Sequence, residues 1–530
     1  MKTTKRILSL LLCTVMMATL FAGCGSKTEP VQKVPQTPGQ TVQTDKQELE
    51  PMEITVAYWD IERMLKGDPI LDELQEKFNV EIVPMNITWD DHGTKEQLWA
   101  STGSLPDVFA CDFRNSANFV QWARDGVIRP LPKDLSKYPN LEAYMNAPAA
   151  DSCMVDGEYY CIFRQTYLSQ AETVKDRFIA YRWDLAQDAG ITEKPTDWNS
   201  FREMLRAIIA ADPEHKSIGG MTALSANYLV GPMFCYSMPN AVVQGATFKW
   251  VEQADGTYVP AYFAGENLGD DALPTWQLMR DMYQEGTIDK DIALATLEQA
   301  ENKFLNGQSA AICTTRRIHL MDQHWEDIYG TSFTDDVAFL DLMPDVNGDT
   351  AYWAWDYAWS ESMFSADVDD AKMDRIMMIY DYLISPEHVM ECKLGIEGET
   401  YEIVDGNPQY IEGVAPFELY PSMEMLGSLV AWTPPLPNGY ALPSDEPLWF
   451  QERSEALVAQ AEKCVLPATV PECTSEFISL GADFGLHCDD DALLIMTGSE
   501  PVEKMWQQIM DDYKAEGLED YIRQVNDALK

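Results

Sequence analysis

The pattern of hydrophobic and polar positions in the first part of the chain alternates between two periods. Short apolar runs that are rich in β-branched and aromatic residues cover 53–60, 80–84 and 105–112, and such runs predict buried strands. Between and after them, apolar side chains recur at helical spacing in Pro69–Phe78 and Ser116–Asp125. Strands that alternate with helices predict an α/β unit with a mostly parallel sheet.

The ends of these predicted strands carry the first candidate binding residues. In sheets of this kind, ligands bind beyond the carboxyl ends of the strands. Trp59 and Asp60 end the first run, and Trp89 follows the second. Asp112 ends the third run, and Arg114 comes just after it. Rings beside carboxylates and a guanidinium offer both an apolar face and hydrogen-bonding groups, so we predict that these residues line a ligand site.

Residues 351–360 hold three tryptophans and two tyrosines. As a strand, the stretch projects one row of rings from a single face: Trp353, Trp355, Tyr357 and Trp359. As a helix, it places Tyr352, Trp355 and Trp359 together. The aromatic composition and the Asn347–Gly348 turn before it favour the strand. Such a row either packs against a sheet or forms a platform for a pyranose sugar, whose C–H groups suit the negative face of an aromatic ring.

The formal net charge of the 530 residues is −48. Such a surface repels nucleic acid and anionic lipid, so we expect neither as a partner. It also disfavours an anionic ligand unless a local basic patch offsets it. Arg316 and Arg317 form one such pair at the end of the apolar run 310–315. They could grip a carboxylate bidentately, or they could balance nearby surface acids.

Motifs for catalysis and for metal binding are missing from the sequence. It contains no G-x-S-x-G, H-E-x-x-H or Walker loop, and no C-x-x-C pair. Glycoside hydrolysis needs two carboxylates at the scissile bond, but 86 acidic residues make chance pairs certain, so composition nominates none. Asp345–Asp349 faintly resembles a calcium loop but lacks its ligand spacing, and it predicts a β-turn. We expect no enzyme, no cofactor and no resident metal ion.

The N-terminal segment predicts location and not chemistry. Three cations precede the apolar run 7–21, which is too short for a comfortable membrane span and has the layout of a signal peptide. Cys24 and the small residues before it resemble a bacterial lipobox, whose cysteine is lipidated and anchors the chain to a membrane. The residues up to Glu50 are rich in Pro, Thr, Gln and Lys. We therefore assign 1–23 to a signal peptide and 24–50 to a lipidated, disordered tether.

Several later segments follow one another in an order that is typical of one protein family. Ser101–Val108 resembles its S-G-x-x-P-D loop, and Asp156–Arg164 resembles its D-G-K-x-Y-G-I-P strand. Further segments with counterparts in the family are Tyr181–Phe201, Tyr283–Asp289, Phe304–Ala310 and Leu394–Glu399. Together with the lipobox, they resemble the extracellular solute-binding proteins of ABC importers, in the group-1 carbohydrate-type lipoproteins of Gram-positive bacteria. The resemblance covers nearly all of residues 51–530.

The resemblance implies an α/β fold of the two-lobed, periplasmic-binding-protein-like type II, with a ligand cleft between lobes that crossing strands join. The implied boundaries are 51–161 and 351–406 for the first lobe, and 162–350 and 407–530 for the second. The first crossing would carry Arg164 and Gln165. The aromatic stretch 351–360 would lie at a second crossing. There we expect one face to pack against the sheet while the cleft end offers rings, with Trp355 and Trp359 foremost.

These patterns and the resemblance together give one functional hypothesis. We expect a monomeric, lipid-anchored subunit at the extracellular face of the cytoplasmic membrane, which captures a neutral oligosaccharide and delivers it to an ABC permease without a covalent step. The predicted ligand-binding residues are Trp59, Asp60, Trp89, Asp112, Arg114, Arg164, Gln165, Arg316, Trp353, Trp355, Asp356 and Trp359. The alternatives are a binding protein for a peptide or another non-sugar solute, and a cell-surface carbohydrate-active enzyme.

Overall fold

The computed structural model describes residues 49–88, 91–114, 116–238, 243–244, 247–248, 250–354, 358–444, 446–465, 480 and 484–530. The compact unit that begins at Leu49 contains two α/β lobes, each with its own sheet and its own large hydrophobic core. In this part of the chain, no helix is both long enough and apolar enough to cross a membrane.

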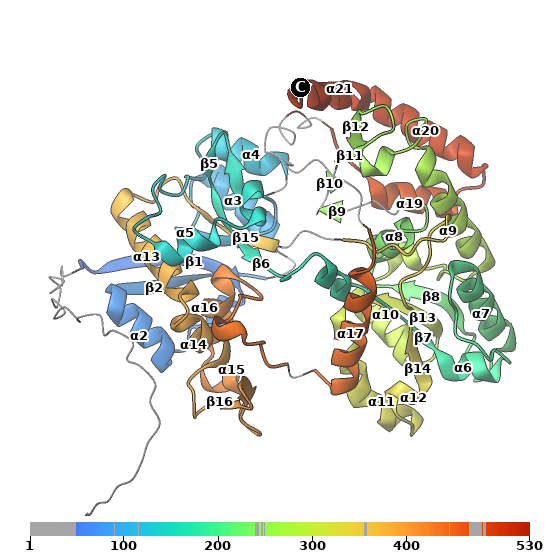
Figure 1. The fold of residues 1–530 in the computed structure, drawn as a ribbon, viewed down its shortest axis with the longest axis horizontal. Helices are drawn as coiled ribbons and strands as arrows, with labels where there is room; N and C mark the ends of the chain where they lie inside the picture. Colours follow the sequence, from blue (N-terminus) through green and yellow to red (C-terminus); the bar gives the residue numbers. More distant parts are fainter. Residues whose placement is uncertain are drawn as a thin grey trace, which may run out of the picture. The chain divides into compact units, whose positions relative to one another are not determined.

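The first lobe is built on a five-stranded sheet in the order β2-β1-β3-β15-β6 (Figure 1). Its strands are β1 (Met52–Trp59), β2 (Val80–Ile87), β3 (Val108–Cys111), β6 (Cys161–Gln165) and β15 (Ala358–Phe364). β1 pairs in parallel with β2 and β3, whereas β15 is antiparallel to β3 and β6. The carboxyl ends of β1, β2 and β3 therefore meet at one edge of the sheet, as the sequence pattern predicted.

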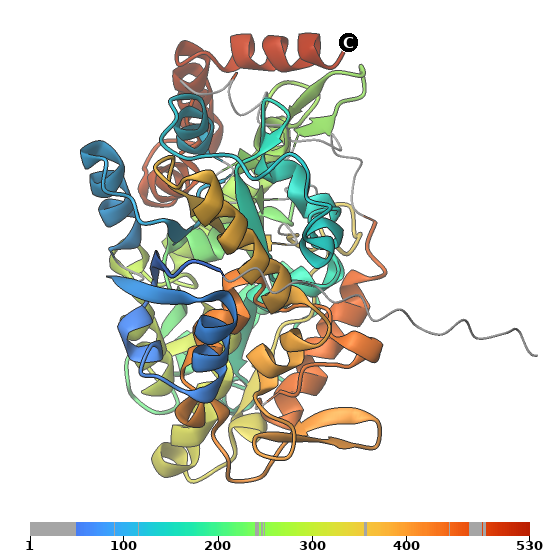
Figure 2. The same cartoon turned by 90° about the vertical axis from the view of Figure 1, so that its left-hand side faces the viewer.

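Helices and two small hairpins surround this sheet. The helices are α1 (Ile61–Met64), α2 (Pro69–Phe78), α3 (His92–Thr102), α4 (Ala117–Arg124), α5 (Pro139–Tyr144), α13 (Asp370–Ile384), α14 (His388–Leu394), α15 (Pro416–Leu419) and α16 (Ser422–Val430). The hairpins are β4 (Met154–Val155) with β5 (Glu158–Tyr159), and β16 (Tyr401–Val404) with β17 (Asn407–Tyr410). Figure 2 shows the gold helix α13 crossing the first lobe. Asp68 begins α2 because its carboxylate accepts hydrogen bonds from the N–H groups of Ile70 and Leu71, both at 3.1 Å.

The second lobe has a four-stranded sheet in the order β14-β7-β13-β8. Its strands are β7 (Phe178–Arg182), β8 (Gly219–Ala223), β13 (Ser309–Thr314) and β14 (Val337–Phe339). Its other paired strands are β9 (Val243–Gln244), β10 (Thr247–Phe248), β11 (Trp250–Glu252) and β12 (Tyr258–Pro260). β13 is parallel to β8 and antiparallel to β7, which also pairs antiparallel with β14. The sheet is therefore mixed.

The helices of the second lobe are α6 (Trp183–Asp188), α7 (Trp198–Ala211), α8 (Ala226–Phe234), α9 (Leu273–Glu285), α10 (Leu297–Leu305), α11 (Asp322–Tyr329), α12 (Phe333–Asp336), α17 (Leu448–Ala461), α19 (Cys488–Thr497), α20 (Val502–Ala515) and α21 (Leu518–Ala528). Asp197 caps α7, because its carboxylate accepts from Ser200 N at 2.7 Å and the Ser200 hydroxyl lies within hydrogen-bonding distance of Asp197 N in return.

The structure corrects two expectations about the later crossings. The core of the first lobe includes Met423, Leu426 and Ala431, so the chain leaves this lobe after residue 431 and not at 407. The sequence missed this because α16 is short and its burial depends on distant partners in β6 and α14. The aromatic stretch is also not one strand: residues 351–354 lie outside any strand, and Tyr352 belongs to a core of the second lobe.

Candidate functional site

The carboxyl end of β1 places Trp59 at the edge of the first sheet. Trp59 is the last residue of β1 and is 1% exposed. Asp60 follows with a φ of 53°, a left-handed conformation that turns the chain into α1. The Asp60 N–H donates to the carbonyl oxygen of Ile87 at 2.8 Å, which ties this turn to the end of β2.

Three indole rings from distant parts of the chain gather at this edge, and we call Trp59, Trp359 and Trp432 the tryptophan cluster. Trp359 stacks on Trp59 with 5.9 Å between ring centroids and 18° between planes. It also stacks on Trp432, at 5.7 Å and 26°. Trp59 is buried, but Trp359 is 40% exposed. The cluster therefore presents a flat apolar ring to solvent on a buried aromatic support, which is the geometry needed to stack against another flat apolar face.

Hydrogen bonds to the backbone of β15 fix the cluster. Trp359 N donates to the hydroxyl of Thr166 at 2.9 Å. The Trp432 indole N–H lies within hydrogen-bonding distance of the Trp359 carbonyl oxygen at 3.2 Å and of Ser360 Oγ at 3.1 Å. Ser360 has a φ of 65°, and the register with β6 shifts between Ala358 and Glu361. This β-bulge re-aims the side chains locally, so that Trp359 reaches solvent while its neighbours in β15 stay buried.

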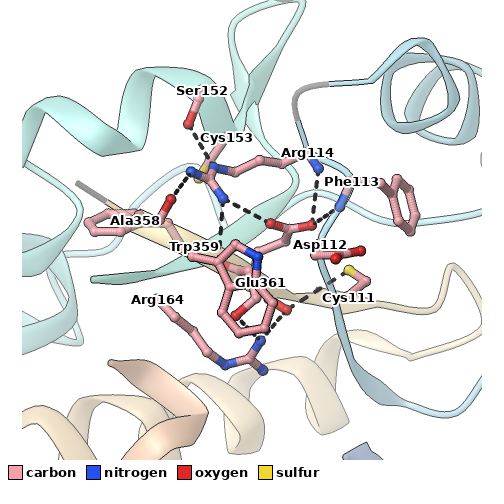
Figure 3. Close-up of polar contacts among 12 residues, drawn as sticks. Cys111, Asp112, Phe113, Arg114, Ser152, Cys153, Arg164, Ala358, Trp359 and Glu361 are labelled. Carbon is pink, nitrogen blue, oxygen red and sulfur yellow. Dashed lines mark hydrogen bonds and ion pairs between the residues drawn. The ribbon is translucent and has the colours of Figure 1, made fainter. Parts of the chain in front are cut away.

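Glu361 is the buried carboxylate beneath the cluster (Figure 3). Glu361 Oε1 accepts from the backbone N–H groups of Phe113 at 2.7 Å and Arg114 at 3.0 Å. Its Oε2 pairs with the Arg114 guanidinium at 3.1 Å, and that guanidinium also donates to the Ala358 carbonyl oxygen at 2.7 Å. Burial raises the pKa of Glu361, and the charge of Arg114 opposes this rise. The pair locks the loop after β3 onto β15.

Arg164 is also buried, with 0% exposure. Its guanidinium donates to the Glu361 carbonyl oxygen at 2.6 Å and to Ser362 Oγ at 2.7 Å, and it lies 5.5 Å from the centre of the Trp59 ring. The sequence pattern predicts direct ligand contact for Arg114 and Arg164. Their burial among protein acceptors instead gives both a supporting role under the tryptophan cluster, because neither presents its donors to solvent.

The acidic side chains at the rim are better placed to meet a ligand. Asp112 is exposed, and its Oδ1 lies 3.3 Å from His92 Nε2. The His92 ring meets Trp59 edge to face, with 5.8 Å between centroids and 70° between planes. Asp60 and Asp112 therefore lie near the cluster as carboxylates, which accept hydrogen bonds from hydroxyl groups. The chain leaves the first lobe after residue 431, and we call this point the third crossing. Gln165 is bound to it, because the Gln165 carbonyl oxygen accepts a hydrogen bond from Thr433 N at 2.9 Å.

Trp353 lies apart from the cluster, in the second lobe. It is 6% exposed, and its ring lies so close to Gly231 that a Cβ there would come within 2.2 Å of it. The Arg177 guanidinium lies 3.8 Å from the centre of the Tyr228 ring and 5.1 Å from that of Trp353. Trp353 also lines a mostly apolar cavity of about 80 Å³, together with Phe178. The position predicted for ligand contact is thus a packed anchor of the second crossing.

Arg316 is engaged with a carboxylate of its own chain. Its Nε and terminal nitrogen lie 3.0 and 2.8 Å from the two oxygens of Glu446. Of the two interpretations that the sequence left open, this contact matches the balancing of nearby acids. Trp89, Trp355, Asp356 and the lipidation candidate Cys24 lie outside the described residues.

Trp432 and His92 belong to the site but were not predicted from the sequence. Trp432 is 73 residues from Trp359, and a lone tryptophan before Thr433 and two prolines carries no pattern that reveals its stacking partner. Over the described ranges, no group of three or more His, Cys, Asp or Glu side chains could hold a metal ion. The arrangement offers stacking and hydrogen bonding.

Comparison with known families identifies a match over about half of the chain. Residues 70–329 match the family model of bacterial extracellular solute-binding proteins. No curated protein matches the sequence at a significant level. The matched segment runs from the second residue of α2 to the last residue of α11, and so includes parts of both lobes.

Solved structures show the same fold. The ABC-transporter substrate-binding protein FusA of S. pneumoniae in complex with kestose is 16% identical, with a TM-score of 0.65 over 89% of this chain and 97% of that chain. The alginate-binding protein AlgQ2 without calcium ion is 14% identical, with a TM-score of 0.63 and the same coverage. An HMO-binding ABC-transporter-associated solute-binding protein from Bifidobacterium longum infantis is 15% identical, with a TM-score of 0.62 over 89% and 97%. The two-lobed binding-protein fold expected from the sequence is therefore confirmed.

Proposed function

Because the chain belongs to the bacterial extracellular solute-binding protein family, we propose that it is the lipid-anchored solute-binding subunit of an ABC importer and captures a neutral oligosaccharide between its lobes. The observation that carries this proposal is the exposed ring of Trp359, stacked on Trp432 and Trp59 at the carboxyl edge of the first sheet. A pyranose face covers such a ring, since its C–H groups meet the negative face of the indole.

The charges around the cluster favour a neutral ligand. Asp60 and Asp112 would accept hydrogen bonds from sugar hydroxyls. The cations that could attract an anion are committed elsewhere: Arg114 to Glu361, Arg164 to backbone and hydroxyl oxygens, and Arg316 to Glu446. The chain also carries a formal net charge of −48, which repels anionic ligands at long range. FusA and the Bifidobacterium protein, whose names record kestose and HMO, support the sugar class through a shared fold.

The mechanism that we propose needs no covalent step. The ligand would stack on Trp359, and closure of the lobes about the three crossings would bury it and select the closed state for the permease. Gln165 and Thr433 join the first and third crossings through a 2.9 Å hydrogen bond, so motion of one crossing is transmitted to the other. Cys24 would carry the lipid anchor, and the segment up to Glu50 would tether the monomeric binding unit at the extracellular face of the membrane.

Calorimetry on the chain without its first 24 residues tests the proposal. Neutral oligosaccharides, with kestose among them, are titrated alongside short peptides. We expect micromolar or tighter binding of at least one sugar and none of a peptide. Trp359→Ala should abolish that heat, whereas Trp183→Ala, at the half-buried start of α6, should preserve it.

Three outcomes would contradict the proposal. Binding of peptides alone would assign the protein to the non-sugar solutes. Release of new reducing ends from a bound oligosaccharide would make it an enzyme. Equal sugar affinity in the Trp359→Ala and Trp183→Ala variants would place the ligand away from the tryptophan cluster.

A further inference from the structure

A buried carboxyl group beside the ligand site has no counterpart in the proposed mechanism. Glu96 lies on α3, one helical turn after His92, and is 1% exposed. Its Oε1 has no hydrogen-bond partner among the described residues. A carboxylate that is buried without a partner is strongly disfavoured, so such a group keeps its proton instead. Burial raises the pKa of Glu96 to about 8.

The charges that face Glu96 come from four elements. His92 on its own helix and Arg164 on β6 favour its ionised form, whereas Asp112 after β3 and Glu361 on β15 oppose it. Arg164 and the partner of Glu361, Arg114, are already held by other groups. Lys95, on the same helix as Glu96, binds other groups: its ammonium lies 2.9 Å from the Asp91 carboxylate and 2.9 Å from the Asn86 carbonyl oxygen in β2. Cys111 also lies nearby as a buried thiol, and burial raises its pKa well above the ordinary value.

His92 connects Glu96 to the tryptophan cluster. The imidazole lies edge-on against Trp59, and its Nε2 is 3.3 Å from Asp112 Oδ1. His92 thus holds the edge of Trp59 and one rim carboxylate at once. Glu96 lies one helical turn from this connecting side chain.

We propose that Glu96 is a positioning residue of the ligand site: as a neutral acid it lets His92 stay on Trp59 and Asp112, and loss of its proton disrupts this arrangement and weakens ligand binding. The inference rests on the proposed function, since it concerns the same site. The ionised carboxylate would be a third negative charge beside Asp112 and Glu361 in a site of low polarity. His92, one helical turn away, can donate its ring N–H to the new carboxylate. This new contact withdraws the imidazole from Trp59 and leaves Asp112 without its partner.

The test is a pair of affinity measurements at pH 6.5 and pH 9, with the neutral oligosaccharide that binds best in the calorimetric panel. We expect the wild-type affinity to fall at least fivefold at pH 9. Glu96→Gln, which keeps the shape and cannot ionise, should bind equally at both values. Glu62→Gln, an exposed acid in the first turn of α1, should behave like the wild type. An equal fall in wild type and Glu96→Gln would overturn the proposal, as would a wild-type affinity that does not change.

A second measurement needs no ligand. Tryptophan fluorescence of the ligand-free chain should show a transition near pH 8, because the charge of Glu96 acts on His92, whose ring packs against Trp59. Glu96→Gln and Glu96→Leu should lack this transition. Absence of sugar binding at pH 6.5 would refute the proposed function and leave this readout to judge Glu96. A flat wild-type titration, or the same transition in a folded Glu96 variant, would overturn the role of Glu96 alone.

Discussion

The two ends of the aromatic stretch 351–360 are alike in composition and opposite in surroundings. At its start, Trp353 is 6% exposed and packs on Gly231 in the second lobe. At its end, Trp359 is 40% exposed and stacks on Trp432 in the first lobe. An indole stabilises the fold when backbone closes over both of its faces, and it can serve a ligand when one face stays open. Within ten residues, the chain therefore carries one tryptophan that packs the second lobe, Trp353, and one that is open to a ligand, Trp359.

The buried charges near the two ends have different partners. Near Trp353, the Arg177 guanidinium lies over the Tyr228 ring and pairs with Asp176. Near Trp359, Glu361 pairs with Arg114, whereas Glu96 Oε1 has no hydrogen-bond partner in the described part of the chain. A buried carboxyl oxygen without a partner is more common where function constrains the site. Four experiments follow from this comparison, from the largest expected effect to the smallest.

Trp353→Ala should lower the free energy of unfolding and leave the affinity for sugar unchanged. Removing a large buried ring from a packed site destabilises a fold by about 3–5 kcal/mol. We expect that loss in urea unfolding monitored by circular dichroism, with sugar affinity unchanged in the folded fraction. A variant with the stability of the wild type but with lost affinity would reverse the roles of the two ends.

Trp359→Ala should show the opposite pattern. Its exposed ring contributes less to the core, so we expect a stability loss of less than about 1 kcal/mol. Loss of a stacking face should weaken sugar binding at least tenfold, which is about 1.4 kcal/mol. Calorimetry and thermal unfolding of the same preparation measure both quantities. A fall in melting temperature that matches that of Trp353→Ala, with affinity retained, would make both ends structural.

The stability of the chain should fall with rising pH because of Glu96. The folded state holds the pKa of Glu96 at about 8, against an ordinary value of 4.5 for an exposed glutamate. This contribution is fully present below the unfolded pKa and is lost as the pH rises through the folded one. While only the folded state binds the proton, the slope is about 1.4 kcal/mol per pH unit. Urea unfolding of wild type and Glu96→Gln at pH 5, 6, 7 and 8 gives the difference, and parallel curves would contradict this assignment.

Arg316→Gln should change little. The arginine side chain is 49% exposed in its pair with Glu446, and such surface pairs contribute less than about 1 kcal/mol. We expect a small stability change and unchanged affinity for neutral sugars. Arg114→Gln is the matched contrast, because it breaks a buried pair with Glu361. A specific loss of acidic-sugar binding in Arg316→Gln would restore the carboxylate-gripping interpretation.

The sequence predicted the parts of the fold that local pattern determines. The first strand, the first long helix and the carboxyl edge that carries Trp59 all follow from the periodicity of apolar residues. The lobe boundary was wrong because α16 is placed by contacts with β6 and α14, which no local window contains.

The same limit applies to the site. The sequence shows that residue 164 is a cation, but not that it is buried. Its guanidinium is 0% exposed because it binds acceptors on β15, almost two hundred residues later in the chain. It marks Trp359 as one ring of a row, but the bulge at Ser360 decides which side it faces. Trp432 has no local signal at all. Composition is enough to predict an aromatic platform, but which tryptophans form it depends on strand pairing between residues far apart in the sequence.

The pairing of β3 with β15 has a consequence for how the protein is made. Cys111 and Glu361 are neighbours in the sheet although 250 residues separate them. The sheet of the first lobe therefore cannot close until most of the chain has been synthesised, and contacts of such long separation form slowly. Late closure leaves the newly made polypeptide open for longer, so the long-range pairing that completes the first lobe also delays its collapse.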